Sequence, residues 1–474
     1  MNRFLLSTGL LIGWTTVVLA QPARNTTQAI HYIKLANTLR AVDKSPDAIN
    51  LLKRALPAVQ GKDLYWQAVT NELLGLSYND LEDRNTALRY LTTARDQYAK
   101  LRYVASAWGV NEVVRNVSGK NLYAGIQIGT SDVKLVILKT SYETDFYEKE
   151  IQSTIDIPDV ALTADASNSF KIGQTALTTC LDTIRRYNIP NERVFVVLGT
   201  DVQQEMARTP DERRRLYSQL SSVLPGGSIR IDTTLTPRRE AELFTVGVIP
   251  RKVWPTTSAL AIGNSSTMGG YFDADRTFHG ISAPVGVNTL VALIENRRSL
   301  SLDAFRREAQ RVVRAVADTA LTRRLNVSGS GFRQRPTVGL GGDVPAALVA
   351  YLHPERAGVA AVPITMDDIE QFKRLAMDDY RTLTRPNLSG IANPAVRDKA
   401  AGDIGTAQSR VTEKQLIAGA LWLEALMNAY AAGSSPKRFV FVRNAEVGWI
   451  TGKFLETISN EYESTIAKGA LYTR

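Results

Sequence analysis

The stretch Leu122-Tyr-Ala-Gly-Ile-Gln-Ile-Gly-Thr-Ser-Asp-Val-Lys-Leu-Val-Ile-Leu138 decides the fold. Two aliphatic runs flank a glycine and three small polar residues, so the pattern predicts a strand, a tight turn and a returning strand. A glycine followed by hydroxyl residues offers backbone N–H groups and hydroxyls to an anion. We therefore predict that Gly129, Thr130 and Ser131 contact a phosphate group.

The same pattern occurs again further along the chain. Ser258–Ile262 is typical of a strand, and a new strand is expected near Gly270–Phe272. Two such hairpins are what a duplicated lobe would produce. The second turn adds five residues to the predicted phosphate contacts, namely Gly263, Asn264, Ser265, Ser266 and Thr267.

A third glycine turn lies in Thr337–Asp343 and leads into a helix that we expect to begin near Pro345. Glycines allow the backbone to approach a ligand closely, and a helix N-terminus favours negative charge. We therefore predict that Gly341 and Gly342 also contact phosphate.

In their order and spacing, these motifs resemble the exopolyphosphatase / guanosine pentaphosphatase (Ppx/GppA) family of the actin-like ATPase superfamily over almost all of residues 122–460. Gly125–Ser131 is similar to that family's first phosphate loop, and Ala261–Thr267 stands where the family has "DIGGGST". Further similar segments are Val194–Thr200, Ile229–Asp232, Arg239–Leu243, Gly247-Val248, Pro284–Val287, Gly419–Leu423, Phe439–Val442 and Gly448–Gly452. The resemblance implies an α/β fold with a two-lobed actin-like (ribonuclease H-like) module, lobe I at residues 119–250 and lobe II with C-terminal helices at 251–474.

The resemblance also implies a chemistry. The family cleaves a terminal phosphate from inorganic polyphosphate or from a guanosine pentaphosphate, a glutamate activates water, and acidic residues on the two loops hold Mg²⁺. That glutamate falls on Glu240 in this chain, which is therefore the expected catalytic residue. A carboxylate can accept a water proton if its site raises its pKa.

The acidic positions of the family are replaced here. Gln127 stands for the aspartate of loop one, and Ala261 and Met268 stand for the aspartate and glutamate of loop two. Mg²⁺ requires hard oxygen ligands and generally carboxylate charge. We therefore assign no metal ligand, although the family implies Mg²⁺. An arginine of the family is also replaced in a stretch that contains Gln203 and Gln204.

Two functions follow from this pattern. Three other carboxylates, Asp132, Asp273 and Asp343, could compensate for the lost acids, and the chain would then be a divergent phosphoanhydride hydrolase that uses Glu240 as general base. Without compensation it would be a pseudoenzyme that binds phosphate, polyphosphate or a nucleotide-like polyanion, and we favour this second function. A sugar kinase of the same superfamily would need a catalytic aspartate that we cannot place.

Residues 21–118 have helical periodicity with a repeated spacing. Leu35-Ala36, Leu39, Ala48, Leu52 and Ala55 recur as Leu74-Gly75, Tyr78, Ala87, Leu91 and Ala94. This spacing resembles the tetratricopeptide repeat, whose concave face binds a peptide or another domain. A generic pair of helical hairpins would share the same apolar stripe. A third helical stretch is predicted over Tyr98–Val117.

The first 20 residues read as a signal peptide, with a basic start, an apolar run and the small-residue site Val18-Leu19-Ala20. We therefore expect export, to the periplasm or the medium. Uncleaved, the same run would be a membrane anchor.

The composition limits the ligands and partners. The net charge of +10 admits a polyanionic partner, but no DNA-reading helix or continuous basic stripe supports binding to DNA. Cys180 stands alone and three scattered histidines form no zinc motif. A homodimer remains open.

Overall fold

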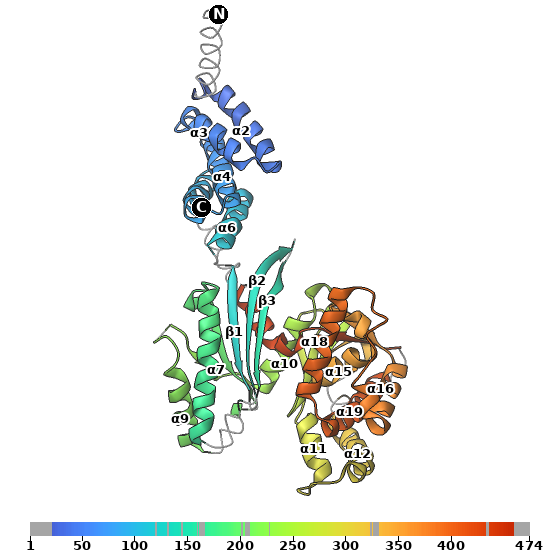
Figure 1. Cartoon of the computed structure of the whole chain (residues 1–474). Coiled ribbons are helices and arrows are strands. Elements are labelled where there is room, and N and C mark those ends of the chain that lie inside the picture. Colours follow the sequence, from blue (N-terminus) through green and yellow to red (C-terminus); the bar gives the residue numbers. More distant parts are fainter. Residues whose placement is uncertain are drawn as a thin grey trace, which may run out of the picture. The chain divides into compact units, whose positions relative to one another are not determined.

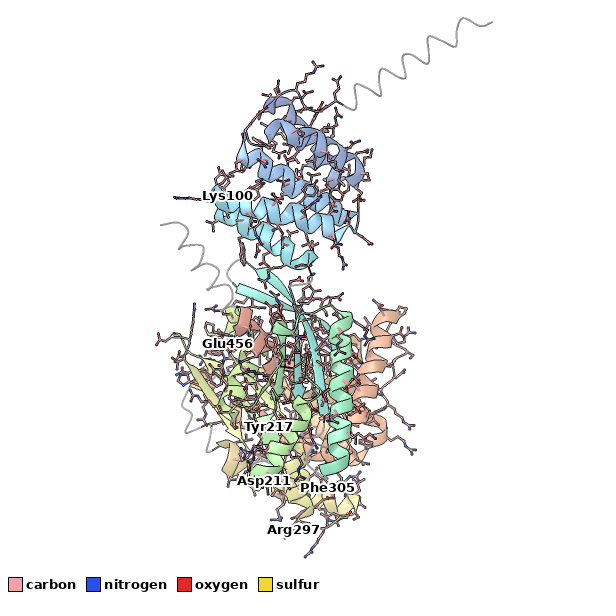
Figure 2. The ribbon with its side chains drawn as sticks, turned by 90° about the vertical axis from the view of Figure 1, so that its left-hand side faces the viewer. Lys100, Asp211, Tyr217, Arg297, Phe305 and Glu456 are labelled. Carbon is pink, nitrogen blue, oxygen red and sulfur yellow. The ribbon has the colours of Figure 1, made fainter. Side chains whose placement is uncertain are left out.

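The computed structural model describes residues 21–118, 121–129, 132–143, 146–158, 160, 166–200, 202–203, 209–226, 228–322, 325, 331–432 and 436–458. The predicted signal peptide, Thr130, Ser131 and Gln204 lie outside the described residues. The chain forms two compact units (Figure 1, and in a second view Figure 2). One unit contains the chain up to Tyr123 and Ile184–Arg193, and the other contains Ala124–Thr183 and the chain from Val194 to Asn460.

Residues 21–118 of the first unit form five α-helices, so the predicted helical stretch is present. Side chains of Asn25, Asp63 and Asp83 accept hydrogen bonds from backbone N–H groups of the first turns and so begin three of the helices. Left-handed residues with φ near 60° end α2, α4 and α5. The five helices are α2 (Thr26–Ala41), α3 (Ser45–Val59), α4 (Leu64–Asp80), α5 (Arg84–Lys100) and α6 (Val104–Val117).

The small residues of the repeated spacing are buried between these helices. Ala36, Ala48 and Ala87 have no exposed surface, and a Cβ on Gly75 would overlap the side chain of Leu91. Leu35 is 43% exposed whereas Leu74, at the corresponding place, is fully buried. The two copies therefore differ at this position, and the assignment as tetratricopeptide repeats stays a prediction.

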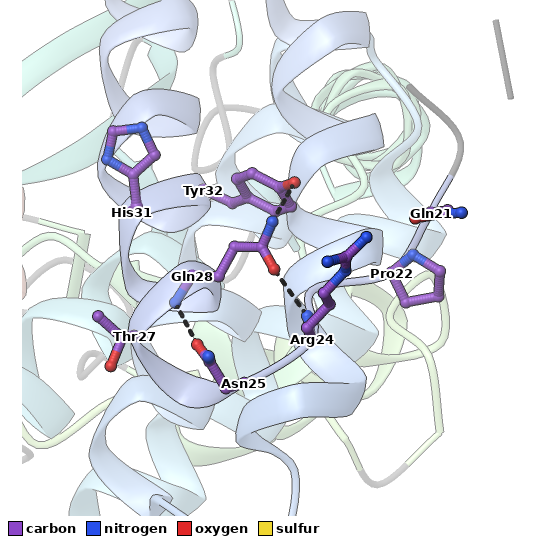
Figure 3. A pocket seen from close by; sticks show the side chains of 8 residues that line it. All are labelled: Gln21, Pro22, Arg24, Asn25, Thr27, Gln28, His31 and Tyr32. Carbon is purple, nitrogen blue, oxygen red and sulfur yellow. Dashed lines mark hydrogen bonds between the residues drawn. The ribbon is translucent and has the colours of Figure 1, made fainter. Parts of the chain in front are cut away.

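A hollow lies at the start of α2 and is lined by polar side chains (Figure 3). Gln28 connects two other residues of its lining: its side-chain oxygen accepts from the Arg24 N–H at 2.8 Å, and its amide nitrogen donates to the Tyr32 hydroxyl at 3.0 Å. None of the predicted phosphate contacts lines it. The lining residues are Gln21, Pro22, Arg24, Asn25, Thr27, Gln28, His31 and Tyr32.

The second unit contains two mixed sheets. The first has the strand order β3-β2-β1-β4-β5, in which β1 pairs in parallel with β4 and β2 pairs antiparallel with β3. Both views place α7 over one face of this sheet with α9 beside it (Figures 1 and 2), and Gln174 of α7 donates to the Gln219 carbonyl of α9. The elements are β1 (Leu122–Ile128), β2 (Asp132–Glu143), β3 (Phe146–Pro158), α7 (Ala166–Arg186), β4 (Val194–Leu198), α9 (Pro210–Ser221), β5 (Ile231–Asp232) and α10 (Pro237–Val248).

The second sheet has the order β10-β11-β9-β6-β7-β8, with β6 and β9 parallel and β6 and β7 antiparallel. Its strands are β6 (Thr257–Ile262), β7 (Thr267–Phe272), β8 (Phe278–Ala283), β9 (Thr337–Gly341), β10 (Ala361–Ile364) and β11 (Arg438–Val442). Its helices are α11 (Val287–Glu295), α12 (Leu302–Ala317), α14 (Gly331–Gln334), α15 (Asp343–Leu352), α16 (Met366–Asp378), α17 (Tyr380–Leu383), α18 (Pro394–Arg410), α19 (Glu413–Ala431) and a last helix over residues 448–458.

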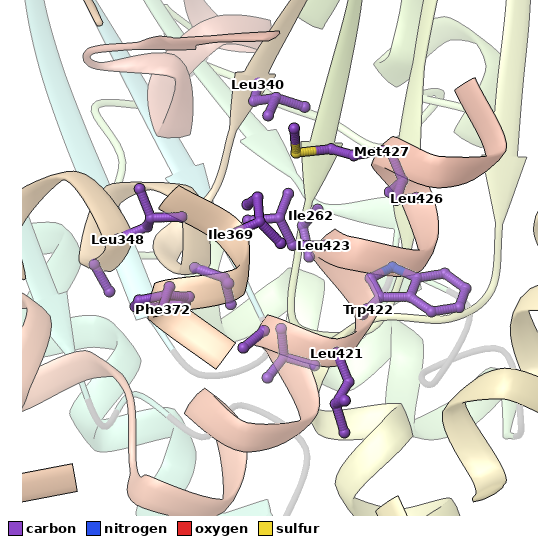
Figure 4. Packing of buried hydrophobic residues seen from close by; sticks show 14 of the residues in the cluster. Ile262, Leu340, Leu348, Ile369, Phe372, Leu421, Trp422, Leu423, Leu426 and Met427 are labelled. Carbon is purple, nitrogen blue, oxygen red and sulfur yellow. The ribbon is translucent and has the colours of Figure 1, made fainter. Parts of the chain in front are cut away.

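The largest described core lies between this sheet and its helices. Trp422 on α19 is fully buried and belongs to the same apolar cluster as residues of β6, β9, α15 and α16, including Ile262, Leu340, Leu348 and Phe372 (Figure 4). The predicted fold class is confirmed: an α/β module with two mixed sheets follows an all-helical stretch. Among the described residues, no helix is long and apolar enough to span a bilayer.

Candidate functional site

Glu240 lies in the first turn of α10 and is nearly buried. Thr236 caps this helix, because its side chain accepts from the Arg239 N–H at 3.2 Å. The Thr200 hydroxyl donates to the Glu240 carboxylate, and the neighbouring Gly199 N–H donates to the Ile128 carbonyl at 2.9 Å. Glu240, at the N-terminus of α10, is therefore held beside the ends of β4 and β1.

The first predicted phosphate turn begins at Gly129. Its N–H donates to the Asp132 carbonyl at 2.8 Å, and a Cβ at this position would overlap the Asp132 carboxylate. A side chain at this position would therefore have to displace the Asp132 carboxylate. The hydroxyl residues predicted to complete this site, Thr130 and Ser131, lie outside the described residues.

The second predicted turn is held by the N-terminus of α11. The Gly263 N–H donates to the Ser266 carbonyl at 2.9 Å, and the carbonyls of Gly263 and Asn264 accept from Val287 and Asn288 at 3.0 and 2.8 Å. Asn264 and the following Ser265 are exposed, while Ser266 is half-buried. The α11 amides that could hold an anion hold this turn instead.

Thr267 has a structural partner on each side of its hydroxyl. The hydroxyl donates to the Val285 carbonyl at 2.7 Å and accepts from the indole N–H of Trp422 at 2.9 Å. Thr267 and Trp422 are both buried. These contacts occupy the hydroxyl that the sequence assigns to phosphate.

The third glycine turn lies beside the second. Ala261 on β6 pairs in register with Gly341 on β9, so the carboxyl ends of these parallel strands meet at one edge of the sheet. Gly342 has φ +109°, and a Cβ there would overlap the Ile262 carbonyl. The structure thus brings two of the three predicted turns together and requires glycine in this one.

The positions that hold metal in the family do not fit Mg²⁺ here. Ala261 and Met268 face each other across β6 and β7, and Met268 packs in an apolar cluster with Ala241 and Phe272. The side-chain oxygen of Gln127 is buried without a hydrogen-bond partner among the described residues. No group of three or more His, Cys, Asp or Glu side chains within the described ranges could hold a metal ion.

The three carboxylates proposed to compensate are all paired. Asp132 contacts Lys134 at 2.9 Å, and Asp343 contacts Arg410 at 3.3 Å. Asp273 contacts His279 at 2.7 Å, and the hydrogen bond from this ring lowers the pKa of Asp273. Each carboxylate therefore already has a protein cation or ring N–H where a metal ion would have to bind.

Sequence reasoning missed three charged residues of the module. Lys134 on β2 lies opposite Asp156 on β3 in the strand register, and the Arg410 guanidinium contacts both Asp156 and Asp343. A signal was present for two of them, because Lys134 and Asp156 interrupt the apolar runs of their strands. The sequence gives no such signal for Arg410, because its helix lies far along the chain from β2 and β3.

Burial and neighbouring charges act on these groups in opposite directions. Burial, the largest influence, raises the pKa of Asp156 against the attraction of Lys134 and Arg410. Burial alone would lower the pKa of Lys134, but the Asp132, Asp343 and Asp156 carboxylates raise it above its ordinary value. Lys134 is therefore held in its charged form.

Comparison with known proteins gives structural matches only. The chain resembles an exopolyphosphatase-like protein of known structure with a TM-score of 0.52 and 14% identity, covering 71% of this chain and 98% of that one. It also resembles an exopolyphosphatase from Cytophaga hutchinsonii (TM-score 0.48, 12% identity) and a Ppx/GppA family member from Aquifex aeolicus (TM-score 0.48, 13% identity). Each of these two matches covers 71% of this chain and 98% of the other protein. No model of a protein family and no curated protein matches the sequence. The two sheets with their helices therefore have the actin-like, two-domain fold of an exopolyphosphatase-like protein.

Proposed function

We propose that this chain is an exported member of the Ppx/GppA family that binds a phosphate-rich polyanion and has weak or absent phosphohydrolase activity. One observation supports this most directly. Glu240 is still anchored by Thr200 at the start of α10, but an amide, a methyl group and a thioether stand at the metal positions, Gln127, Ala261 and Met268.

The loss of catalysis follows from electrostatics. Phosphoryl transfer depends chiefly on positioning and on positive charge that stabilises the transition state. Met268 instead packs against Phe272 and its apolar neighbours, where no divalent cation could be bound. A general base alone contributes only about 10²–10⁴-fold to a rate. Glu240 without a metal would therefore support slow hydrolysis at best.

The alternative is an active exopolyphosphatase-type hydrolase, and the burial of Glu240 favours it. Glu240 is 7% exposed, with one carboxylate oxygen accepting from Thr200. In this alternative the Glu240 carboxylate takes a proton from the attacking water, the water oxygen bonds to the terminal phosphorus, and the P–O bond to the rest of the substrate breaks, so that the shortened chain leaves.

Phosphate release from polyphosphate separates the two functions. Purified protein would be incubated with Mg²⁺, Mn²⁺ or Ca²⁺ and compared with Glu240→Gln. Glu242→Gln is the matched control, because this glutamate lies on the same helix and pairs with Arg239. Release that falls at least about a hundredfold in Glu240→Gln but not in the control would establish the alternative.

Calorimetry tests binding independently of hydrolysis. We expect tripolyphosphate or ATP to bind in the presence of EDTA at low salt, because the proposed contacts need no divalent ion. No heat for either anion would refute polyanion binding by this module.

We further propose that the helical unit binds a protein or peptide partner. Tyr65 and Tyr103 are 40% and 49% exposed, with ring centroids 5.6 Å apart, and exposed Val104 adjoins them. Exposed apolar groups that cluster in this way are typical of interaction surfaces. The full chain carrying Tyr65→Ser and Tyr103→Ser should lose a partner that the unchanged chain retains in a pull-down.

Export has a direct test. Protein expressed with its own leader should begin at Gln21 when it is recovered outside the cytoplasm, and an intact N-terminus there would contradict cleavage. Light scattering on the same sample would decide whether the chain forms the homodimer that the sequence leaves open.

A further inference from the structure

Five charged side chains from β2, β3, α15 and α18 contact one another in the second unit. The Lys134 ammonium contacts Asp132 at 2.9 Å on the same strand and lies opposite Asp156 on the next one. One guanidinium nitrogen of Arg410 donates to Asp156, and the other donates to Asp343 at 3.3 Å. Arg410, at the end of α18, therefore joins a strand of the first sheet to the helix that follows the third glycine turn.

The charges in this cluster nearly balance but leave an excess carboxylate. Asp132, Asp156 and Asp343 face two cations, and Glu446 also acts on Arg410 from η5 (Ala445–Val447). The five side chains are between 14% and 29% exposed, so solvent screens them only in part. A phosphate group that approached this arrangement would meet net negative charge.

Asp156 differs from the other two carboxylates in having a buried oxygen without a hydrogen-bond partner among the described residues. Only one of its oxygens accepts from Arg410, and the other is buried without a hydrogen-bond partner among the described residues. A buried acceptor without a partner is costly. Asp132 and Asp343, in contrast, each belong to a turn or a helix start beside their cation.

We propose that Lys134 and Arg410 form a phosphate-binding site that the Asp156 carboxylate occupies in the unliganded protein. This inference rests on the proposed polyanion-binding function and names the cations of its site. A guanidinium recognises carboxylate and phosphate oxygens with the same geometry, so a terminal phosphate can displace Asp156 from Arg410. The displacement breaks no covalent bond and needs no metal ion.

The site should respond to pH. Because burial raises the pKa of Asp156, this group is protonated more readily than an ordinary aspartate. Protonation removes one negative charge, while Lys134 and Arg410 remain charged beside Asp132, Asp343 and Glu446. Affinity for phosphate therefore increases as the pH falls toward the pKa of Asp156.

Two variants test the proposal by calorimetry with tripolyphosphate in EDTA. Asp156→Asn should bind about tenfold more tightly than the unchanged chain and Arg410→Gln about tenfold more weakly, because each substitution changes one charge-assisted hydrogen bond of the site. Asp403→Asn and Arg443→Gln are matched controls, because they change the same charges in a pair with an N–O distance of 2.7 Å. The controls should differ from the unchanged chain by less than about twofold, since they leave the site intact.

The outcomes separate this inference from the proposed function. If the unchanged chain binds but Asp156→Asn behaves like Asp403→Asn, Asp156 only joins the two parts of the module and the inference fails alone. If no variant binds the anion, both fail. The thermal unfolding temperature of each variant is recorded as well, so that lost binding in Arg410→Gln is not confused with lost folding.

Discussion

Thr267→Val should destabilise the module strongly without changing the phosphate site directly. The substitution keeps the side-chain shape but removes a hydroxyl that joins the Trp422 indole N–H at 2.9 Å to the Val285 carbonyl at 2.7 Å. Both Thr267 and Trp422 are buried, so neither group left behind can turn to water. Each buried group without a partner costs about 1–3 kcal/mol, so the two groups together give a loss of about 2–6 kcal/mol in the free energy of unfolding.

Urea unfolding followed by tryptophan fluorescence measures this loss. Thr267→Ser is the control, because it keeps the hydroxyl and removes one methyl group, which costs about 1 kcal/mol. Trp422→Phe removes the indole donor, so Thr267→Val should cost about 1–2 kcal/mol less in that background than in the unchanged chain. The reasoning is refuted if Thr267→Val is no more harmful than Thr267→Ser, or if it keeps full stability and loses tripolyphosphate binding.

Two further predictions concern residues outside the site. Burial raises the pKa of the Cys180 thiol to about 12, so a thiol reagent at pH 8 should modify it only after denaturant is added, and rapid reaction of the native chain would contradict its burial. Asp368→Asn should cost about 1–2 kcal/mol at pH 7, because the carboxylate caps α16 at Thr365 and contacts His353 at 3.0 Å. Burial is the largest influence on the pKa of Asp368 and acts to raise it, but the hydrogen bonds from Thr365 and His353 prevail and lower it. Its stabilisation is therefore present above the ordinary aspartate pKa of about 3.9 and is lost as the pH falls through the lowered value, so urea unfolding of variant and unchanged chain should converge in acid and differ at pH 7.

The elements that depend on local sequence were predictable. Alternation of apolar runs with glycine turns placed β1, β2, β6 and the glycines of three turns, because strand and turn preferences act over a few residues. The helical stretch expected over Tyr98–Val117 is instead divided at Arg102, which has φ 60°. No glycine or proline marks this break, so periodicity alone continued the helix through it.

The surroundings of the side chains were less predictable. Thr267 fits a phosphate motif in the sequence, but its hydroxyl is engaged by Trp422, which lies far along the chain on α19. Leu35 and Leu74 share a spacing, yet Leu35 lies on the first helix of the stack and is exposed. Partners of this kind are set by tertiary packing, and motifs in a single sequence do not reveal it.

The missing metal acids and the paired carboxylates have a common physical basis. In a magnesium-dependent site the cation neutralises the carboxylates that surround the substrate, and without it those carboxylates need another counter-charge. In this chain Lys134 and Arg410 supply that charge to Asp132, Asp156 and Asp343. A protein cation, unlike a metal ion, is tethered and cannot enter together with the substrate. At the proposed site, phosphate competes with the carboxylates that already hold these cations, so substitution of Asp156, rather than of Glu240, should raise the affinity.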